Sequence, residues 1–270
     1  IIASRNEEEI KRIAKSLSEH FDVKKPGEIR QCLGIEFLRE GDTITLNQSG
    51  YISEILKRFG MDNCNPVSTP FDPSMKLEKG TEISPEDKRE IPYRELVGCL
   101  TYLASTTRPD LAFAASSLGQ FNNCFDESHS KAAKRVLRYL KGTIDVGLTY
   151  RPNTAPVIGY TDSNWGNCPV DRRSHSGFVF LLSGSAISWD SKKQKTVALS
   201  TCEAEYMALT EGAKEATFLQ RFLKELGFDD LSNITMYGDN LGAIKLAGNP
   251  VFHQRSKHID VKYHYVRDAL

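Results

Sequence analysis

The sequence has no excess of charge of either sign, because 35 lysine and arginine residues balance 35 aspartate and glutamate residues over 270 positions. A uniformly basic surface that binds nucleic acid along its whole length is therefore excluded, although local basic patches are not. The longest apolar stretch, around residues 96–104, is far shorter than the roughly 20 residues of a membrane-spanning helix. We therefore expect no membrane partner.

The six cysteines are widely dispersed, and the sequence contains no Cys-x-x-Cys pair. This spacing argues against a zinc knuckle or a disulfide framework and is typical of reduced thiols. No charged and then apolar leader opens the sequence. We therefore expect an intracellular location, in the cytoplasm, the nucleus or both. The first residue is Ile1, and the last residues resemble the end of a helix, so we expect the chain to belong to a longer polypeptide.

Apolar residues make up 40% of the chain, which is enough to fill the cores of two domains. In residues 1–60 we predict a helix capped by Asn6, a β-hairpin that turns at Gly41-Asp42, and a helix that ends before Gly60. Residues 61–92 hold five of the eleven prolines and are predicted to be an extended connection. Residues 93–150 are predicted to be mainly helical.

One predicted helix, within residues 131–143, has a basic side opposite an apolar side. The basic side consists of Lys131, Lys134, Arg135, Arg138 and Lys141. A solvated cationic surface explains this pattern as well as a surface that lies along a phosphate backbone does. Both interpretations remain open from the sequence.

Residues 156–270 change to alternating strands and helices. We predict strands at 157–161, 177–182, 186–189 and 234–237, a long helix from Ser200 to about Leu226, and shorter helices at 241–247 and 257–267. Asp162 directly follows the first of these strands, and Asp239 follows the fourth. If these two strands are parallel, the long helix is a crossover between them, and the two carboxylates become neighbours.

Glu205 lies in the first turns of the long helix and shares a side with Ala208, Leu209 and Gly212. A carboxylate on this small, apolar side faces the sheet, where burial without a partner is unfavourable. Repulsion by Asp162 and Asp239 would add to this cost unless divalent cations neutralise the group. Carboxylate oxygens suit Mg²⁺ or Mn²⁺, and such ions promote hydrolysis of phosphodiesters.

Taken one at a time, these acidic residues have ordinary structural explanations. An aspartate at a strand end is commonly a turn former or a helix cap, and a helical glutamate is commonly solvated. Glu203, which follows Ser200 by three residues, has the spacing of a capping box. The argument that the three carboxylates form one site rests on the order of the elements. A strand followed by an aspartate comes first, then two more strands, then a helix with a glutamate, and last another strand followed by an aspartate.

Several longer motifs resemble the ribonuclease H region of copia-type retrotransposon Pol polyproteins. They are Gly159-Tyr160-Thr161-Asp162-Ser163-Asn164-Trp165-Gly166, Arg172-Arg173-Ser174-His175-Ser176-Gly177, Glu203-Ala204-Glu205-Tyr206, Gly238-Asp239-Asn240 and Arg255-Ser256-Lys257-His258-Ile259-Asp260. Leu33-Gly34-Ile35-Glu36 and Gly50-Tyr51-Ile52 resemble the end of the reverse transcriptase palm and its primer grip. Thr107-Arg108-Pro109-Asp110 resembles the connection between the two regions.

The resemblance implies an α/β fold with a ribonuclease H-like mixed sheet and a crossover helix at 156–270. An α+β palm remnant (1–60), a proline-rich connection (61–92) and a helical thumb or connection region (93–150) would precede it. It implies hydrolysis of the RNA strand of RNA–DNA hybrids with Mg²⁺ bound by Asp162, Glu205 and Asp239. The other implied partner is the remainder of the polyprotein.

Two differences from the family pattern bear on activity. The sequence contains no Tyr-x-Asp-Asp run, so we expect no polymerase active site in this chain. A fourth acidic residue of the family would follow the helix that contains His258 and His264, beyond Leu270, so we expect metal binding or hydrolysis to be weak. The competing hypothesis is an inactive or domesticated fragment that only binds nucleic acid or protein.

Other residues are candidates for contact with nucleic acid or for structural roles. Arg172, Arg173, Lys192 and Lys193 flank two strands, where they could grip phosphates or lie in solvated loops. His258, Asp260 and His264 are expected on a helix surface, because zinc sites need a fuller ligand set. The two tryptophans, Trp165 and Trp189, are expected in the core.

Overall fold

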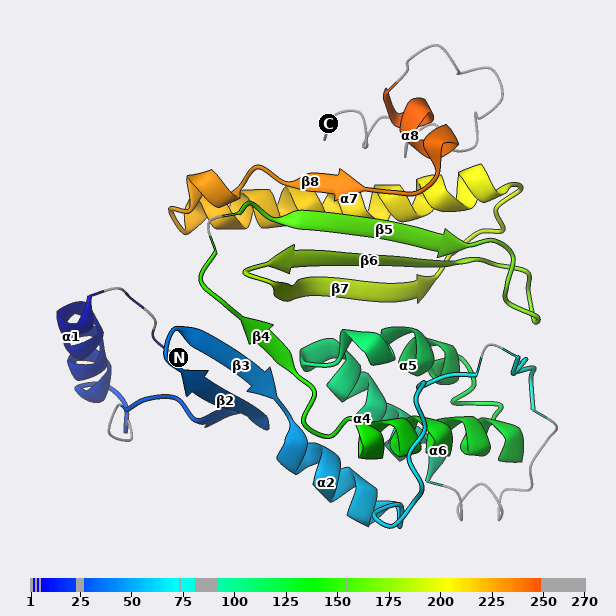
Figure 1. Ribbon diagram of the computed structural model, residues 1–270, viewed down its shortest axis with the longest axis horizontal. Coiled ribbons are helices and arrows are strands. Elements are labelled where there is room, and N and C mark those ends of the chain that lie inside the picture. Colours follow the sequence, from blue (N-terminus) through cyan, green and yellow to red (C-terminus); the bar gives the residue numbers. More distant parts are fainter. Residues whose placement is uncertain are drawn as a thin grey trace.

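The computed structural model describes residues 2, 4, 6–22, 27–72, 74–80, 92–153 and 155–248. Within these residues the chain has a mixed α/β architecture, with seven α-helices and two four-stranded sheets (Figure 1). The first sheet and a group of helices come from the first part of the chain. The second sheet and its long helix come from the rest.

The first sheet confirms the predicted hairpin. Strands β1 (Gln31–Cys32), β2 (Ile35–Glu40), β3 (Thr43–Asn47) and β4 (Leu148–Tyr150) pair in that order, and every pair is antiparallel. Helix α1 (Glu7–Ser18) precedes them and begins as predicted, because the Asn6 side chain accepts hydrogen bonds from the N–H groups of Glu8 and Glu9. Gly60, with φ +63°, follows the end of helix α2 (Ser49–Arg58).

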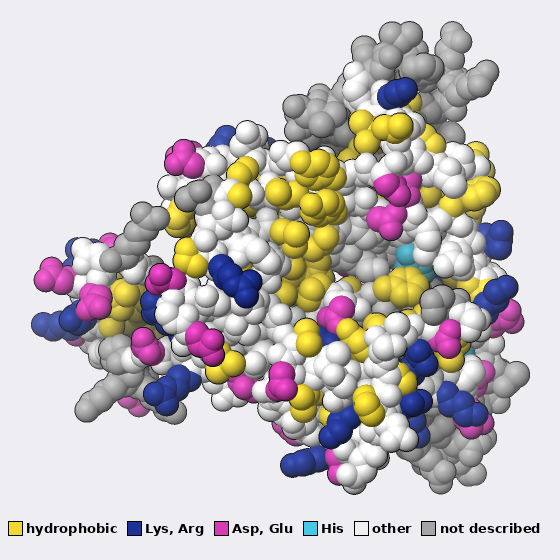
Figure 2. All heavy atoms as spheres, viewed as in Figure 1, with side chains coloured by type: hydrophobic (Ala, Val, Ile, Leu, Met, Phe, Trp, Pro, Cys, Tyr) yellow, Lys and Arg dark blue, Asp and Glu magenta, His cyan; other side chains and the backbone are white. Residues whose placement is uncertain are grey.

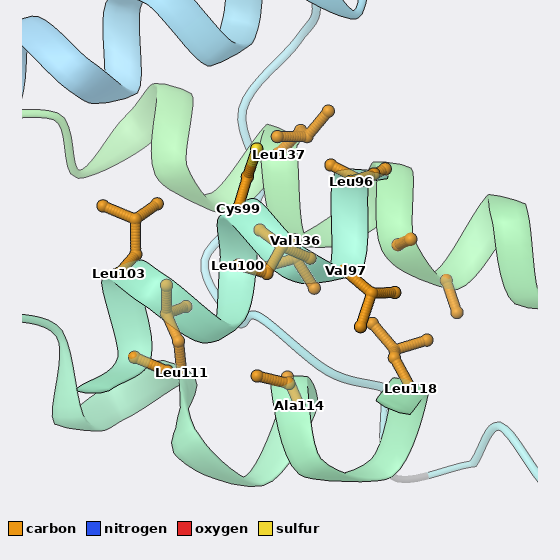
Figure 3. Packing of buried hydrophobic residues seen from close by; sticks show 14 of the residues in the cluster. Leu96, Val97, Cys99, Leu100, Leu103, Leu111, Ala114, Leu118, Val136 and Leu137 are labelled. Atoms are coloured by element: carbon orange, nitrogen blue, oxygen red, sulfur yellow. The ribbon is translucent and has the colours of Figure 1, made fainter. Parts of the chain in front are cut away.

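The helices of the first part form one hydrophobic core. Helices α2, α4 (Tyr93–Thr106), α5 (Ala112–Gly119) and α6 (Glu127–Gly142), with a short 3₁₀ turn at Pro109–Leu111, direct their apolar sides toward one another (Figure 3). Leu100, Leu103, Leu118 and Leu137 are completely buried there. Burial of whole leucine side chains stabilises each contact region by about 1.5–3 kcal/mol per residue.

The Thr107-Arg108-Pro109-Asp110 motif supports this helical region from inside. The Arg108 guanidinium is fully buried and binds the Asp110 carboxylate at 2.7 and 3.0 Å. It also donates to the carbonyl and hydroxyl oxygens of Thr143 at 3.0 and 2.8 Å. A buried guanidinium needs this full set of partners, so in this structure the motif joins the start of α5 to the end of α6.

The predicted segments 1–60 and 93–150 are not independent in packing. Residues of α2 and of α4 to α6 belong to the same hydrophobic cluster. Strand β4, near the end of the predicted helical region, pairs with β3 of the hairpin. The predicted domain boundaries stay a prediction, but residues 31–58 and 93–150 share both a core and a sheet.

The second sheet has the strand order β7-β6-β5-β8. Strands β5 (Ile158–Asn164), β6 (His175–Leu182) and β7 (Ser185–Lys193) are antiparallel neighbours, whereas β5 and β8 (Thr235–Tyr237) are parallel, as the sequence argument required. Helix α7 (Thr201–Glu225) connects β7 to β8 and packs on β5 and β6. A 3₁₀ turn (Asp229–Leu231) precedes β8, and helix α8 (Leu241–Gly248) follows it.

Polar contacts join the helical region to the second sheet. The Trp189 indole N–H of β7 donates to the carbonyl oxygen of Ala104 in α4 at 2.6 Å. The Tyr150 hydroxyl donates to the carbonyl oxygen of Ala186 at 2.6 Å. Helix α5 packs beside β7. The helices α4 to α6 therefore lie beside β7, and β5 and β8 lie farther from them in the sheet (Figure 1).

Candidate functional site

Asp162 lies inside strand β5, which extends to Asn164. The sequence argument placed it after the strand, and that placement was wrong, because the pairing of Asp162 with Gly177 and of Asn164 with His175 prolongs the ladder. An aspartate within a paired strand is not a turn former. The structure therefore excludes the explanation that Asp162 is a turn former at the end of the strand.

Glu205 reaches the same place from helix α7. The helix begins at the predicted residue, because the Ser200 hydroxyl accepts the N–H of Glu203 at 3.1 Å. The Glu203 carboxylate accepts the N–H of Leu199, the residue before the cap, at 2.7 Å, so this bond lies one residue earlier than the predicted capping box places it. Glu205 is half-buried, and its Oε1 accepts hydrogen bonds from the backbone N–H and the hydroxyl of Ser163 at 3.2 and 3.0 Å.

Gly212 allows α7 to approach the sheet closely enough for that contact. A Cβ atom at this position would lie 2.4 Å from Cγ2 of Thr161 and 2.7 Å from Cε of Met236. No real side chain tolerates such distances without movement of its neighbours. Glycine at this position therefore sets the spacing between α7 and the strands β5 and β8, and Glu205 lies two turns earlier on the same helix side.

Asp239 lies two residues beyond the end of β8 and two residues before the start of α8. The sequence left open whether it is a helix cap, and the structure gives that role to Asn240. The Asn240 side-chain oxygen accepts the N–H of Ala243 at 3.0 Å, and its carbonyl oxygen accepts the N–H of Ile244 at 3.1 Å. Asp239 is exposed, so its carboxylate is available for another function.

The three carboxylates come together. One oxygen from each of Asp162, Glu205 and Asp239 lies within 4.8 Å of the others, and the two aspartates are exposed. Burial raises the pKa of Glu205, and the nearby negative charges of Asp162 and Asp239 raise it further, against the opposing effect of its hydrogen bonds to Ser163. A divalent cation would relieve exactly this repulsion. The all-oxygen donor set fits Mg²⁺ or Mn²⁺.

Residues that the sequence argument did not assign also belong to this site. Ser163 fixes the orientation of Glu205, and its position next to Asp162 was the only signal in the sequence. Tyr160 and Tyr237 precede Asp162 and Asp239 by two residues, pair across β5 and β8, and stack with ring centroids 5.5 Å apart. Both rings are about half exposed. Tyr160 and Asp162 lie two residues apart within β5, which puts them on the same face of the sheet, and Asp239 lies two residues beyond Tyr237, the last residue of β8.

The tyrosine pair continues as a hydrophobic row across the sheet. Tyr160 pairs with Val179 of β6, and Val179 pairs with Trp189 of β7. Figure 2 shows hydrophobic side chains as a band that crosses this sheet. The carboxylate cluster therefore lies at one side of an exposed, partly aromatic sheet surface.

The predicted basic residues around the sheet differ in their contacts. Lys193 binds the Asp171 carboxylate at 2.9 Å, and Arg173 binds it at 3.7 Å. Lys192 pairs with Asp190. Arg172 is exposed and has a left-handed backbone with φ +58°. Their contact with nucleic acid stays a prediction, with Arg172 the most available of the four.

The basic side of α6 has a structural role that the sequence did not indicate. Arg135 donates to the Thr69 hydroxyl at 2.9 Å, and Arg138 donates to the Asn65 carbonyl at 2.7 Å, so both hold the proline-rich connection. Lys131 forms a surface ion pair with Glu127 at 2.9 Å. Lys134 and Lys141 are exposed. These contacts join segments more than sixty residues apart, which periodicity alone does not reveal.

Two further predictions have different outcomes. Trp165 is 55% exposed, so its expected place in the core was wrong, and its indole N–H instead donates to the Ala198 carbonyl at 3.0 Å. His258, Asp260 and His264, with the predicted helix at 257–267, lie outside the described residues. No helix in the described ranges is both long and apolar enough to cross a bilayer.

Comparisons with known proteins decide the family. Residues 1–73 match the reverse transcriptase (RNA-dependent DNA polymerase) family. The retrovirus-related Pol polyprotein from transposon TNT 1-94 of Nicotiana tabacum is 40% identical over the whole chain, and the match covers 21% of that polyprotein's length. The corresponding polyprotein from transposon RE1 of Arabidopsis thaliana is 41% identical over 94% of the chain and 17% of its own length. The transposon Ty5-1 protein YCL074W of Saccharomyces cerevisiae is 31% identical over 76% of the chain and 67% of its own length.

The chain belongs to the copia-type retrotransposon Pol family. It spans about a fifth of the length of the two Pol polyproteins named above. Family membership covers both regions of the structure, because the matches extend along the whole chain, whereas the reverse transcriptase match ends in the proline-rich connection. The carboxylate cluster lies in the part that follows that match.

Proposed function

We propose that the second sheet and its helices form a ribonuclease H-like domain that hydrolyses the RNA strand of RNA–DNA hybrids in a metal-dependent reaction. The observation that carries this proposal is the convergence of Asp162, Glu205 and Asp239, whose carboxylate oxygens lie within 4.8 Å of one another. Asp162 comes from β5, Asp239 from the segment just after the parallel strand β8, and Glu205 from the helix between them in sequence. Such an acidic cluster suits divalent metal ions.

The arrangement of the elements supports the same proposal. The mixed sheet has the strand order β7-β6-β5-β8. Its first three strands along the chain are antiparallel, and a crossover helix leads to the fourth, which is parallel to the first. The fold predicted from the family resemblance has this pattern. The predicted domain at 156–270 includes residues beyond Gly248 that lie outside the described part of the chain.

Asp162, Glu205 and Asp239 would hold Mg²⁺, or Mn²⁺ in its place. Such ions supply stabilisation for the negative charge that develops when water attacks a phosphodiester. The chain's own residues position the ligands: Ser163 orients Glu205 through two hydrogen bonds, and Asn240 caps α8 so that Asp239 does not have to. Gly212 keeps the helix of Glu205 close to the strand of Asp162.

The surroundings of the cluster suit a nucleic-acid strand. Exposed aromatic rings at Tyr160 and Tyr237 can pack against sugars or bases, which such rings contact in many nucleic-acid complexes. Arg172 offers an exposed cation in the loop that follows β5. The partners we propose are an RNA–DNA hybrid and the remainder of the Pol polyprotein. Because the sequence has no Tyr-x-Asp-Asp run, DNA synthesis is not part of the proposal.

The direct test is cleavage of a hybrid whose RNA strand carries a fluorescent label, in buffer with Mg²⁺. We expect the wild-type chain to shorten the RNA strand and not the DNA strand. Asp162→Asn should reduce the rate by about 100-fold or more, because it removes a charged ligand without a change in shape. Glu211→Gln, on an exposed side of the same helix, should retain the wild-type rate.

Two results would count against this function. Cleavage that survives Asp162→Asn would show that another site or a contaminant performs the reaction. Hybrid binding by the wild type, measured by fluorescence anisotropy, without cleavage in Mg²⁺ or Mn²⁺ would favour the competing hypothesis of a fragment that only binds nucleic acid.

A further inference from the structure

A cavity of about 470 Å³ lies apart from the carboxylate cluster, where three distant segments of the chain meet. The proline-rich connection contributes residues 70, 71 and 75–77, and the loop between β5 and β6 contributes residues 166–169 and 172. Helix α5 and the turn that follows it contribute residues 113, 117, 120 and 121. His175, at the start of β6, completes the lining. Volumes in this range are typical of sites for small organic molecules.

Aromatic rings form much of the apolar wall. Phe71 from the connection and Phe113 from α5 meet edge to face, with centroids 5.4 Å apart. Phe113 also meets the His175 imidazole at 5.3 Å. Phe121 adds a third ring to the lining. Flat aromatic walls of this kind favour a flat, aromatic ligand group.

Buried polar groups lie beside these rings. The Gln120 amide nitrogen and Nε2 of His175 are 3.2 Å apart, and His175 is only 8% exposed. The backbone N–H of His175 donates to the Asn164 side chain at 2.8 Å, which fixes the residue in place. Burial lowers the pKa of His175, as does the positive charge of Lys193, against the opposing effect of Asp171. An imidazole and an amide offer hydrogen-bonding groups side by side.

The charged side chains that line the cavity are all positive. Lys76 and Arg172 are exposed at the cavity, and none of its lining residues is an aspartate or glutamate. A shallower groove nearby, which reaches Asp162, is lined by Asp110 and Asp190 as well. The lining of the cavity therefore carries positive charge and suits an anionic ligand directly, whereas the groove carries acidic side chains.

We propose that this cavity binds a nucleotide unit. The base lies against the phenylalanine rings, its polar edge meets Gln120 and His175, and its phosphate meets Lys76 and Arg172. Aromatic stacking, edge recognition by amides and imidazoles, and cations for the phosphate are the chemistry by which proteins hold nucleotides. This site goes beyond the proposed hydrolysis, because none of the three carboxylates lines it.

A nucleotide unit can come from a free nucleotide or from a nucleic-acid strand, and the chemistry is shared. The cavity lies where a nucleic-acid strand bound at the carboxylates could reach it. Asn164, which pairs with His175, is two residues beyond Asp162 on β5, or about 6.6 Å along the strand. A strand that reaches the carboxylates could place a neighbouring nucleotide in the cavity.

The test is calorimetric titration of the full chain with AMP and, separately, with short single-stranded RNA and DNA trinucleotides. EDTA is present throughout, so that no divalent ion at the carboxylates contributes to binding. The binding result can therefore be interpreted even if the hydrolysis proposal fails. Arg172→Asn removes the charge but tolerates the left-handed backbone, and it should weaken binding about tenfold. Gln120→Leu should weaken it about fivefold.

Matched controls are Arg221→Asn and Gln220→Leu, both at exposed positions of α7 away from the cavity, and binding by these variants should stay within about twofold of wild type. A second measurement locates the ligand. His175 lines the cavity and His20 does not, so a saturating ligand should shift the NMR signals of the His175 ring protons and leave those of His20 unchanged.

Binding of AMP, with these variant effects, would identify a free nucleotide as a sufficient ligand. Binding of trinucleotides alone, with the same variant effects, would identify a strand as the source. The proposal is overturned if neither probe binds at millimolar concentration, or if Arg172→Asn and Gln120→Leu bind as the wild type does.

Discussion

The helical region and the second sheet are built from different kinds of core. The helices α2 and α4 to α6 enclose one continuous cluster in which leucines such as Leu100 are completely buried. The second sheet and α7 instead contain two small clusters in the described part of the chain. One comprises Tyr206, Ala213, Ala243 and Ala247, and the other comprises Val157, Phe180, Leu219 and Leu223.

This contrast follows from what each region has to position. A close approach between α7 and the sheet brings Glu205 to Asp162, and close approach requires small residues such as Ala204, Ala208 and Gly212 at the contact. Small residues bury little apolar area, so they contribute little stability. The region with the candidate site is therefore the less strongly packed one, and Phe218 and Phe222 remain substantially exposed on its helix.

The largest effect on stability should come from the helical core. Leu100→Ala should reduce the free energy of unfolding by about 3–5 kcal/mol, because the dense surroundings cannot collapse into the cavity. Leu219→Ala, in a small cluster at 7% exposure, should cost about 2 kcal/mol. Urea unfolding measured for both variants checks this order. Equal losses, or a larger loss for Leu219→Ala, would contradict the contrast between the two cores.

A smaller effect is expected at the contact between α7 and the sheet. Gly212→Ala should cost about 1–3 kcal/mol, because the new Cβ overlaps Thr161 and Met236. It should also reduce hybrid cleavage by displacing the helix of Glu205. Gly98→Ala in α4, where nothing lies within 4 Å of the new Cβ, should instead stabilise by about 0.5–1 kcal/mol.

Thermal melting and cleavage assays of these two variants test that explanation. A neutral or stabilising Gly212→Ala with full activity would show that the close approach is not required for the site. Destabilisation by Gly98→Ala would show that the helical region is as tightly constrained at glycine positions as the sheet region is.

The smallest effect concerns acid stability in the two regions. Burial raises the pKa of Asp171, but hydrogen bonds from Lys193, Cys168 and Arg173 outweigh it and lower the pKa to about 2. In the helical region, Ser128 and His129 likewise outweigh burial and lower the pKa of Asp126 to about 2. A depressed carboxylate pKa stabilises the fold above the ordinary value near 3.8, and this stability is lost as the pH falls toward 2.

The free energy of unfolding, measured by urea titration, should therefore fall less between pH 5 and pH 2.5 for Asp171→Asn and Asp126→Asn than for the wild type. The difference should be about 1 kcal/mol for each variant. The exposed Asp145→Asn should have the slope of the wild type. Identical slopes for all four proteins would show that neither ionised aspartate stabilises its region.

Local signals in the sequence predicted much of this fold. Asn6 and Ser200 begin their helices, Gly60 follows the end of α2, and the parallel pairing of β5 and β8 meets the condition under which the order of strands and helix makes Asp162 and Asp239 neighbours. These features depend on neighbouring residues or on chain topology, both of which are visible in a sequence.

Long-range contacts account for what the sequence did not predict. The α6 arginines bind the connection, and Trp165 is anchored at the surface by a carbonyl from a later segment. The length of β5 beyond Asp162 depends on pairing with His175 and Ser176. The cavity between the connection, α5 and the β5–β6 loop unites segments that have no shared pattern along the chain.

The central claim is that Asp162, Glu205 and Asp239 act together as a divalent metal site, and Mn²⁺ binding followed by electron paramagnetic resonance tests it most directly. We expect the wild type to bind Mn²⁺, and Asp162→Asn, Glu205→Gln and Asp239→Asn each to weaken binding by about tenfold or more. Glu211→Gln should bind as the wild type does. Equal Mn²⁺ affinity in the wild type and all three site variants would contradict the account.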